Sequence, residues 1–176
     1  MKEYDLDKLL ANQDLINKNI IKFLQKGILT NQDIDADEIK GHLLKSDHNL
    51  RFVAENIKLR FFDWVTIGCY YACYHAALAL ILTKGYSSKN HLATLCVLIR
   101  EFYNRELSKK DLEILSNFID YHDLLFYVEA KNKREDAAYS TKTKFDQNDT
   151  EQLRLKAILL VSKFKLVVGT AVKTVR

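Results

Sequence analysis

The sequence predicts an all-α protein, an up-and-down bundle of five to six antiparallel helices around one core. Its 176 residues include no proline and only 5 glycines, so few positions interrupt a helix. Apolar residues recur every three or four positions in several long stretches, which is the helical period. No stretch shows sustained alternation of apolar and polar residues, so we expect no sheet. The length and the hydrophobic content of 48% fit a single domain with a substantial core.

The first two helices are expected from apolar stripes in the N-terminal third of the chain. One helix should cover residues 5–25 and end at Gly27, because glycine suits the turn that follows a helix. A polar and acidic loop over residues 31–37 leads to a second helix over residues 36–60.

The central helix is expected over residues 64–82, the most apolar stretch of the chain. Asp63 is its expected N-cap, and Gly85 suits the turn after its C-terminus. The stretch is also about as long as a membrane span. Its tyrosines and its histidine lie in the middle, however, whereas the aromatic belts of a span lie at the ends. We therefore expect a helix buried in a bundle and no membrane contact.

The remaining helices are placed by their capping residues. Ser88 is the expected N-cap of the next helix. Ser108 and Asp111 resemble a capping box, although the acid in that motif is usually glutamate. Asp149 or Thr150 is expected to open the last helix, in which apolar residues repeat to the end of the chain.

Cysteine usage and the N-terminal sequence favour a cytoplasmic protein. The three cysteines are an odd number in apolar surroundings, which is typical of reduced, buried thiols. No basic start followed by an apolar core is present, so we expect no signal peptide. Cys69 and Cys73 share a helix face near His75, but a zinc site needs a fourth ligand. We therefore expect no metal and, because Gly-rich phosphate loops are absent, no cofactor.

Three tyrosines and one histidine lie within six residues of the central helix. Each ring brings a polar atom that needs a partner when it is buried. Tyr71 and His75 lie four residues apart and so share a helix face. The functional interpretation places them at the floor of a cleft or along a dimer seam. The alternative is an ordinary core histidine with a satisfied hydrogen bond.

The segment after residue 130 holds the sharpest candidate for a binding site. Arg134 can contact two phosphate oxygens with its planar guanidinium, and Lys131 and Lys133 add positive potential. Tyr139 can stack on a base or donate a hydrogen bond. The alternative is that Arg134 pairs with a nearby acid and fixes a helix end.

Two further observations favour an anionic partner. Residues 131–176 contain 11 Lys/Arg and 5 Asp/Glu, whereas residues 1–130 contain 16 and 18. Lys89 and His91 open a helix, where unpaired backbone N–H groups favour anions, so they are candidates to join Arg134 at one phosphate site. The alternatives are a solvated face on the last helix and a loop of exposed polar residues.

Four motifs in order resemble those of HEPN (higher eukaryotes and prokaryotes nucleotide-binding) domains. The run YYACYHAALALIL is followed by KG, by SKNH and then by VEAKNKREDAAYS, which is similar to the family's Arg-x-x-Ala-x-Tyr element. The resemblance covers roughly residues 40–172, so residues 1–35 would be an extra helix and loop before a core over residues 36–176. It implies a helical bundle that binds a nucleotide or RNA. It also implies nucleotidyltransferase partners and toxin–antitoxin, defence or RNA-processing systems.

The chain departs from the pattern of the family's nucleases in one respect. In many of them an arginine is followed four to six residues later by a histidine, and here the place after Arg134 holds Tyr139. A tyrosine, with a pKa of about 10, is poorly suited to acid–base chemistry near neutral pH. We therefore expect a non-catalytic module that binds a nucleotide or RNA phosphate, or a partner protein. The alternatives are a divergent metal-independent ribonuclease, using Arg134 with Tyr139 or with His91 or His122, and a helical oligomerisation scaffold.

A homodimer is expected from the amount of apolar surface. A bundle of this size can enclose one fully apolar helix, and residues 64–82 provide it. The broad apolar stripe over residues 153–175 is then available to a partner, and twofold dimers are the commonest soluble oligomers.

Overall fold

The computed structural model describes residues 4–132 and 147–174, with side chains over residues 4–120 and 147–172. These residues form seven helices and one two-stranded sheet, so the expected all-α class is confirmed. The elements in chain order are α1 (Leu6–Ala11), α2 (Gln13–Gln25), β1 (Leu29–Asn31), α3 (Ala36–Lys58), α4 (Phe62–Leu82), β2 (Tyr86–Ser88), α5 (His91–Phe102), α6 (Lys109–Asn132) and α7 (Gln147–Thr174).

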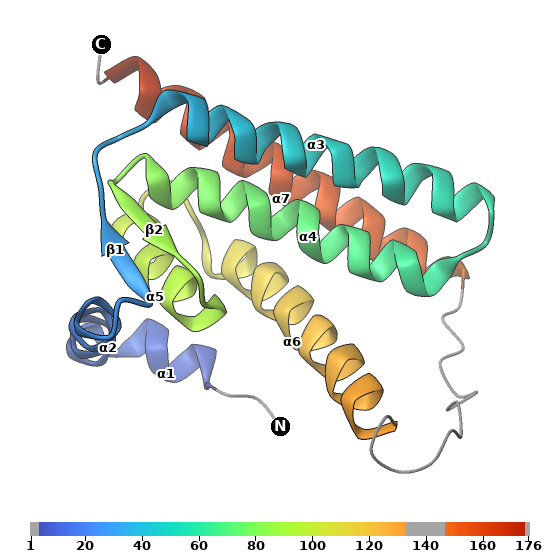
Figure 1. Ribbon diagram of the computed structural model, residues 1–176, viewed down its shortest axis with the longest axis horizontal. Coiled ribbons are helices and arrows are strands. Elements are labelled where there is room, and N and C mark those ends of the chain that lie inside the picture. The colour runs from blue at the N-terminus through green and yellow to red at the C-terminus, as the bar shows by residue number, and fades with distance from the viewer. Residues whose placement is uncertain (1–3, 133–146, 175–176) are drawn as a thin grey trace.

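The four long helices alternate in direction, and α4 lies at their centre (Figure 1). Helices α3, α5, α6 and α7 all pack against α4, and α2 packs against α5. Helix α6 begins near α5 and diverges from α4 toward its own C-terminal end (Figure 1). The core is therefore built around α4, and α5 connects it to the N-terminal helices.

Helix α4 is buried because it carries apolar residues on all of its faces. By length and composition it is a candidate membrane span, but 72% of that stretch is buried inside the protein. Gly68 permits the close approach of α3, since a Cβ at this position would lie 2.6 Å from Cγ2 of Val53. The expectation of a core helix over residues 64–82 agrees with the observed bounds, Phe62–Leu82.

The sheet corrects the expectation that the chain has none. Strands β1 and β2 pair antiparallel, with Leu29 opposite Ser88 and Asn31 opposite Tyr86. Each strand has three residues, which is too short for an alternating pattern to be recognised in the sequence. The pairing also joins segments separated by more than fifty residues, so no local signal specifies it.

The expected helix over residues 5–25 is two helices, and Asn12 explains the break. Its backbone N–H donates to Leu9 O at the end of α1, and its side chain accepts from Leu15 N at the start of α2. One asparagine therefore ends one helix and caps the next.

The other helix ends agree with the sequence in part. Ser108 and Asp111 form the expected capping box, with Ser108 N donating to Asp111 Oδ2 at 2.8 Å. Asp63 is not the N-cap of α4, because Phe61 holds that position without a side-chain bond and Asp63 lies in the first turn. Helix α7 begins at Gln147, before the expected Asp149 or Thr150.

Ser88 is not the N-cap of α5. It ends β2, and its hydroxyl accepts from the backbone N–H of Asn90 at 3.3 Å. Asn90 is the cap, and its side-chain oxygen accepts from Ala93 N at 3.0 Å. The sheet register decides this, because the pairing of Ser88 with Leu29 keeps the chain extended up to Ser88.

Candidate functional site

A cluster of aromatic side chains lies between α4 and the start of α5. We call Tyr70, Tyr71, Tyr74 and His91 the Tyr–His cluster. The hydroxyl of Tyr70 and Nε2 of His91 are 2.6 Å apart and share a hydrogen bond. The rings of Tyr70 and Tyr74 are stacked, with centroids 5.7 Å apart and an interplanar angle of 12°. The rings of His91 and Tyr74 are nearly perpendicular, with centroids 4.9 Å apart, and the centroids of Tyr71 and Tyr70 are 4.8 Å apart.

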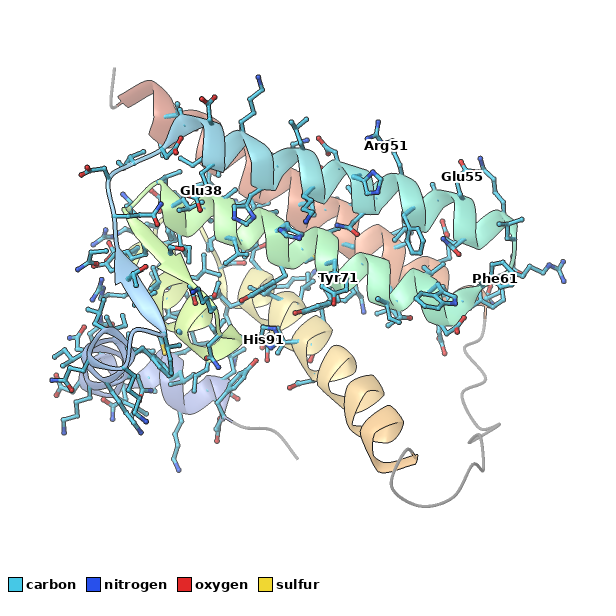
Figure 2. All side chains as sticks on the ribbon, in the orientation of Figure 1. Glu38, Arg51, Glu55, Phe61, Tyr71 and His91 are labelled. Carbon is cyan, nitrogen blue, oxygen red and sulfur yellow. The ribbon has the colours of Figure 1, made fainter. Side chains whose placement is uncertain are left out.

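The spacing along α4 places these rings together. Tyr70 and Tyr74 are one helical turn apart, so their rings lie side by side on one face. Tyr70 is only 2% exposed, whereas the other three members of the cluster are half-buried. Figure 2 shows Tyr71 on the side of α4 that faces α6, and His91 at the start of α5. The cluster therefore has a buried base and an accessible edge.

The environment keeps the Tyr74 hydroxyl protonated. Burial raises the pKa of Tyr74, and a hydrogen bond with Thr94, at 3.4 Å, partly offsets the effect. A neutral phenol can donate a hydrogen bond but is a poor base at neutral pH. The half-buried edge of the cluster is thus suited to stacking and hydrogen bonding.

Lys89 lies directly before α5, and its side chain is exposed. Its backbone N–H donates to Ile28 O at 3.2 Å, which fixes this short loop against the chain before β1. No ion pair engages the Lys89 side chain within the described part of the chain. The structure thus brings Lys89 and His91 to the same helix start, as expected, with the His91 ring directed at Tyr70.

His75 does not join the Tyr–His cluster, although it follows Tyr71 by one turn. Its Nδ1 lies 3.0 Å from Nδ1 of His42 on α3, and the two rings are 5.2 Å apart. Burial, then the charges of His42 and Lys45, lower the pKa of His75 to about 4. The partner His42 lies 33 residues away on another helix, so no local pattern in the sequence predicts this pair.

Burial also lowers the pKa of His42, although the charge of Glu38 opposes the effect. Both rings are therefore neutral at pH 7, and one must donate to the other. A histidine with a pKa of about 4 is a weak base and cannot supply a proton at neutral pH.

The three cysteines are free and buried, as expected. Burial raises the pKa of Cys69 to about 12 and of Cys96 to about 11, and it raises the pKa of Cys73 as well. Protonated thiols are poor nucleophiles and poor metal ligands. Among residues whose side chains are described, no group of three His, Cys, Asp or Glu could hold a metal ion.

The predicted binding segment lies largely outside the described residues. Arg134, Lys133 and Tyr139 fall between α6 and α7, in residues 133–146. Lys131 and His122 lie on α6, where only the backbone is described. The proximity of Arg134 to Lys89 and His91 therefore stays a prediction.

No model of a known protein family matches the sequence. No curated protein matches it either.

Proposed function

We propose that this chain is a non-catalytic, HEPN-like module that binds the phosphate of a nucleotide or RNA. The observation that supports it is the arrangement at the start of α5. There the exposed Lys89, which has no ion-pair partner among the described side chains, lies two residues before His91. The His91 ring is hydrogen-bonded to Tyr70, and the Tyr70 ring is stacked on Tyr74.

Each part of this arrangement suits one part of a nucleotide. A lysine attracts the phosphate, and the accessible face of an aromatic ring stacks on a base without regard to the base's identity. The first turn of α5 adds a positive helix end, although Asn90 already occupies the Ala93 N–H. Arg134 would contribute the oriented, two-point contact with the phosphate.

The histidines support binding without catalysis. The Nε2 atom of His91 shares a hydrogen bond with the Tyr70 hydroxyl, and His75, with a pKa of about 4, is neutral at pH 7. A general acid or base needs a pKa near the working pH, which His75 lacks, and the Nε2 atom of His91 is already engaged. The missing histidine after Arg134 in the sequence is consistent with this.

A binding titration with short fluorescent RNA and labelled ATP tests the proposal. Arg134→Ala should weaken binding by about tenfold or more, because a charge-assisted contact contributes roughly 1.5–3 kcal/mol. Lys89→Ala should weaken it about threefold, and mainly at low salt, because an exposed charge is screened. Lys110→Ala is the matched control, since Lys110 is an exposed lysine beyond the other end of α5. The proposal fails if the parent binds neither ligand, or if folded Arg134→Ala binds as well as the parent.

A homodimer is the oligomeric state that we propose with this function. The apolar stripe expected to face a partner is buried in the core instead, with Leu160 and Phe164 at most 1% exposed. The proposed contact therefore depends on other leucines of α7. Leu155 and Leu159 lie one turn apart on α7 and are 42% and 69% exposed. Together they form an apolar patch on the outer face of a core helix, and a twofold contact would cover it in both copies. The double variant Leu155→Glu/Leu159→Glu should give a monomer by light scattering at micromolar concentration. Ile21→Glu, which changes an exposed residue on α2, should leave the dimer intact. A monomeric parent would refute the dimer without affecting the binding proposal.

The resemblance also proposes a class of protein partner. Nucleotidyltransferases accompany HEPN domains, so a small nucleotidyltransferase encoded by an adjacent gene is the partner to test. Co-purification of the two chains that survives a high-salt wash would support the assignment, and separate elution would refute it.

A further inference from the structure

A cavity of about 490 Å³ lies where the ends of α4 and α5 meet the second half of α7. We call it the α4–α5–α7 cavity. Its volume is within the range of small-molecule sites. Three cations line it, and each comes from a different place in the fold. Lys84 follows α4, Arg105 follows α5, and Lys163 lies on α7.

These three cations have no acidic partner within the described part of the chain. The ammonium of Lys84 lies over the Phe102 ring, 5.5 Å from its centroid. Arg105 makes one long contact, from Nη1 to the backbone oxygen of Glu101 at 3.5 Å. Among the described residues that line the cavity, Glu106 is the one acid, so this lining has a net charge of +2 from three cations and one anion.

The wall of the cavity is apolar. Phe102 and Val167 are almost fully buried behind it, whereas Leu166 is 69% exposed at its rim. The cavity thus combines an exposed apolar side chain with cations that have no acidic partner among the described residues. A ligand that covers the leucine and presents a negative charge to the cations would satisfy both.

We propose that the α4–α5–α7 cavity binds a small amphipathic organic anion, with a carboxylate or phosphate head and an apolar body. The head lies among Lys84, Arg105 and Lys163, and the apolar body packs on the exposed Leu166. We assign the site to a free small molecule because the cavity is a local hollow of about 490 Å³.

Two other cavities lack this combination. One is lined by Asp5, Asp7 and Glu113, so its charge is unsuited to an anion. Another, between α3 and α7, is mainly apolar, and its Lys165 is already paired with Asp47 at 2.8 Å. Cations without an acidic partner in the described part of the chain, together with the exposed Leu166, therefore distinguish the α4–α5–α7 cavity from both.

This site is separate from the proposed nucleotide site. His91 is the first residue of α5 and Phe102 is the last, so the sites lie at opposite ends of that helix. A rise of about 1.5 Å per residue puts those two residues roughly 16 Å apart along the helix axis. A substitution at Lys163 should therefore leave nucleotide binding unchanged, and the two proposals can fail independently.

Fluorescence titration with 1-anilinonaphthalene-8-sulfonate, an apolar probe with one negative charge, measures binding to the cavity. The parent should bind it saturably at one site per chain, and octyl phosphate should displace it. Octyltrimethylammonium has the same apolar tail with the opposite charge and should not displace it. Absence of saturable binding, or equal displacement by the cation, would overturn the proposal.

Charge reversal at the cavity is the sharpest test. Lys163→Glu should weaken probe binding by about tenfold or more, because it replaces an attraction by a repulsion at close range. Lys156→Glu is the matched control, because Lys156 is exposed on the same helix and does not line the cavity. Equal affinities of the two variants, with unchanged circular dichroism, would show that the cations do not bind the head.

A second pair of variants tests the apolar wall. Leu166→Gln should weaken probe binding about threefold or more, since the apolar body loses its partner. Leu44→Gln, at a leucine that is 58% exposed on α3, should bind like the parent. Sedimentation with vesicles of anionic phospholipid should leave the protein in the supernatant. Co-sedimentation that Lys163→Glu abolishes would assign the cavity to a membrane lipid headgroup and overturn the free-ligand proposal.

Discussion

His91 and His75 both contact helix α4, yet they are held in opposite ways. His91 shares its hydrogen bond with a tyrosine hydroxyl, which can donate or accept. His75 shares its hydrogen bond with a second imidazole, which requires that at least one of the two rings be neutral. The α4–α5 contact therefore has a partner for either protonation state of His91, whereas the α3–α4 contact weakens when both histidines are protonated. Two histidines thus give one helix contact, α4–α5, whose stability should depend little on pH, and one, α3–α4, whose stability should fall in acid. We call these contacts the pH-tolerant junction and the pH-sensitive junction.

The largest expected effect comes from removing the buried ring of the pH-tolerant junction. Tyr70→Ala should lower the free energy of unfolding by about 3–5 kcal/mol, as for other buried aromatic residues, because it leaves a cavity under α5. Tyr71→Ala, at a half-buried ring of the same cluster, should cost less. Urea unfolding followed by circular dichroism measures both, and equal costs would show that Tyr70 is not the anchor of this junction.

The pH dependence of stability tests the other junction. The folded-state pKa of His75, about 4, is lower than the ordinary value of 6.5, so the unfolded chain binds a proton first on acidification. The contribution is present above pH 6.5 and is lost as the pH falls toward 4. For this half-buried site, after discounting for screening by solvent, the loss should be about 1–2 kcal/mol.

Urea unfolding at pH 7 and at pH 4.5 gives that difference. Other carboxylates also titrate in this range, so the informative quantity is the change that His75→Gln makes in the pH dependence. His75→Gln should reduce the loss of stability, whereas His91→Gln should leave it nearly as in the parent. If the two variants behave alike, the contrast between the junctions is wrong.

A smaller effect is expected at the edge of the Tyr–His cluster. Tyr74→Phe removes only the hydroxyl that faces Thr94 across 3.4 Å, a long hydrogen bond. The loss should be about 0.5 kcal/mol, at the low end for a hydrogen bond. Tyr70→Phe removes a bond of 2.6 Å and should cost more, so the order of the two variants in unfolding experiments sharpens the comparison.

The smallest expected effect concerns catalysis. His75 is neutral at pH 7 and Nε2 of His91 is engaged by Tyr70, so incubation with single-stranded RNA without metal should give little or no cleavage. Any trace activity should be the same in His75→Ala as in the parent. Robust cleavage that Arg134→Ala abolishes would favour the divergent ribonuclease over the binding module.

The helices could be predicted from the sequence because their signals are local. The apolar run of α4 and the capping pair Ser108–Asp111 each act within a few residues of the chain. Two of the wrong helix ends are controlled by the sheet or by a residue that caps two helices. Ser88 is drawn into β2 by its partner Leu29, and Asn12 serves two helices at once.

The candidate site could be predicted only in part. Lys89 and His91 are two residues apart at the start of a helix, so their proximity could be predicted from the sequence. The direction of each ring does not follow, because a half-buried aromatic turns toward whichever partner another element supplies. The His91 ring is hydrogen-bonded to Tyr70, and the His75 ring is hydrogen-bonded to His42.

The sequence by itself determined that this chain is helical, that α4 is its core and that its cysteines are buried. These properties depend on composition and on a period of three to four residues, which the chain carries locally. Only the tertiary structure decided that His42 meets His75, that β1 meets β2, and that Lys84, Arg105 and Lys163 surround one cavity. Those contacts join residues far apart in the chain, and their free energy depends on the packing of whole helices.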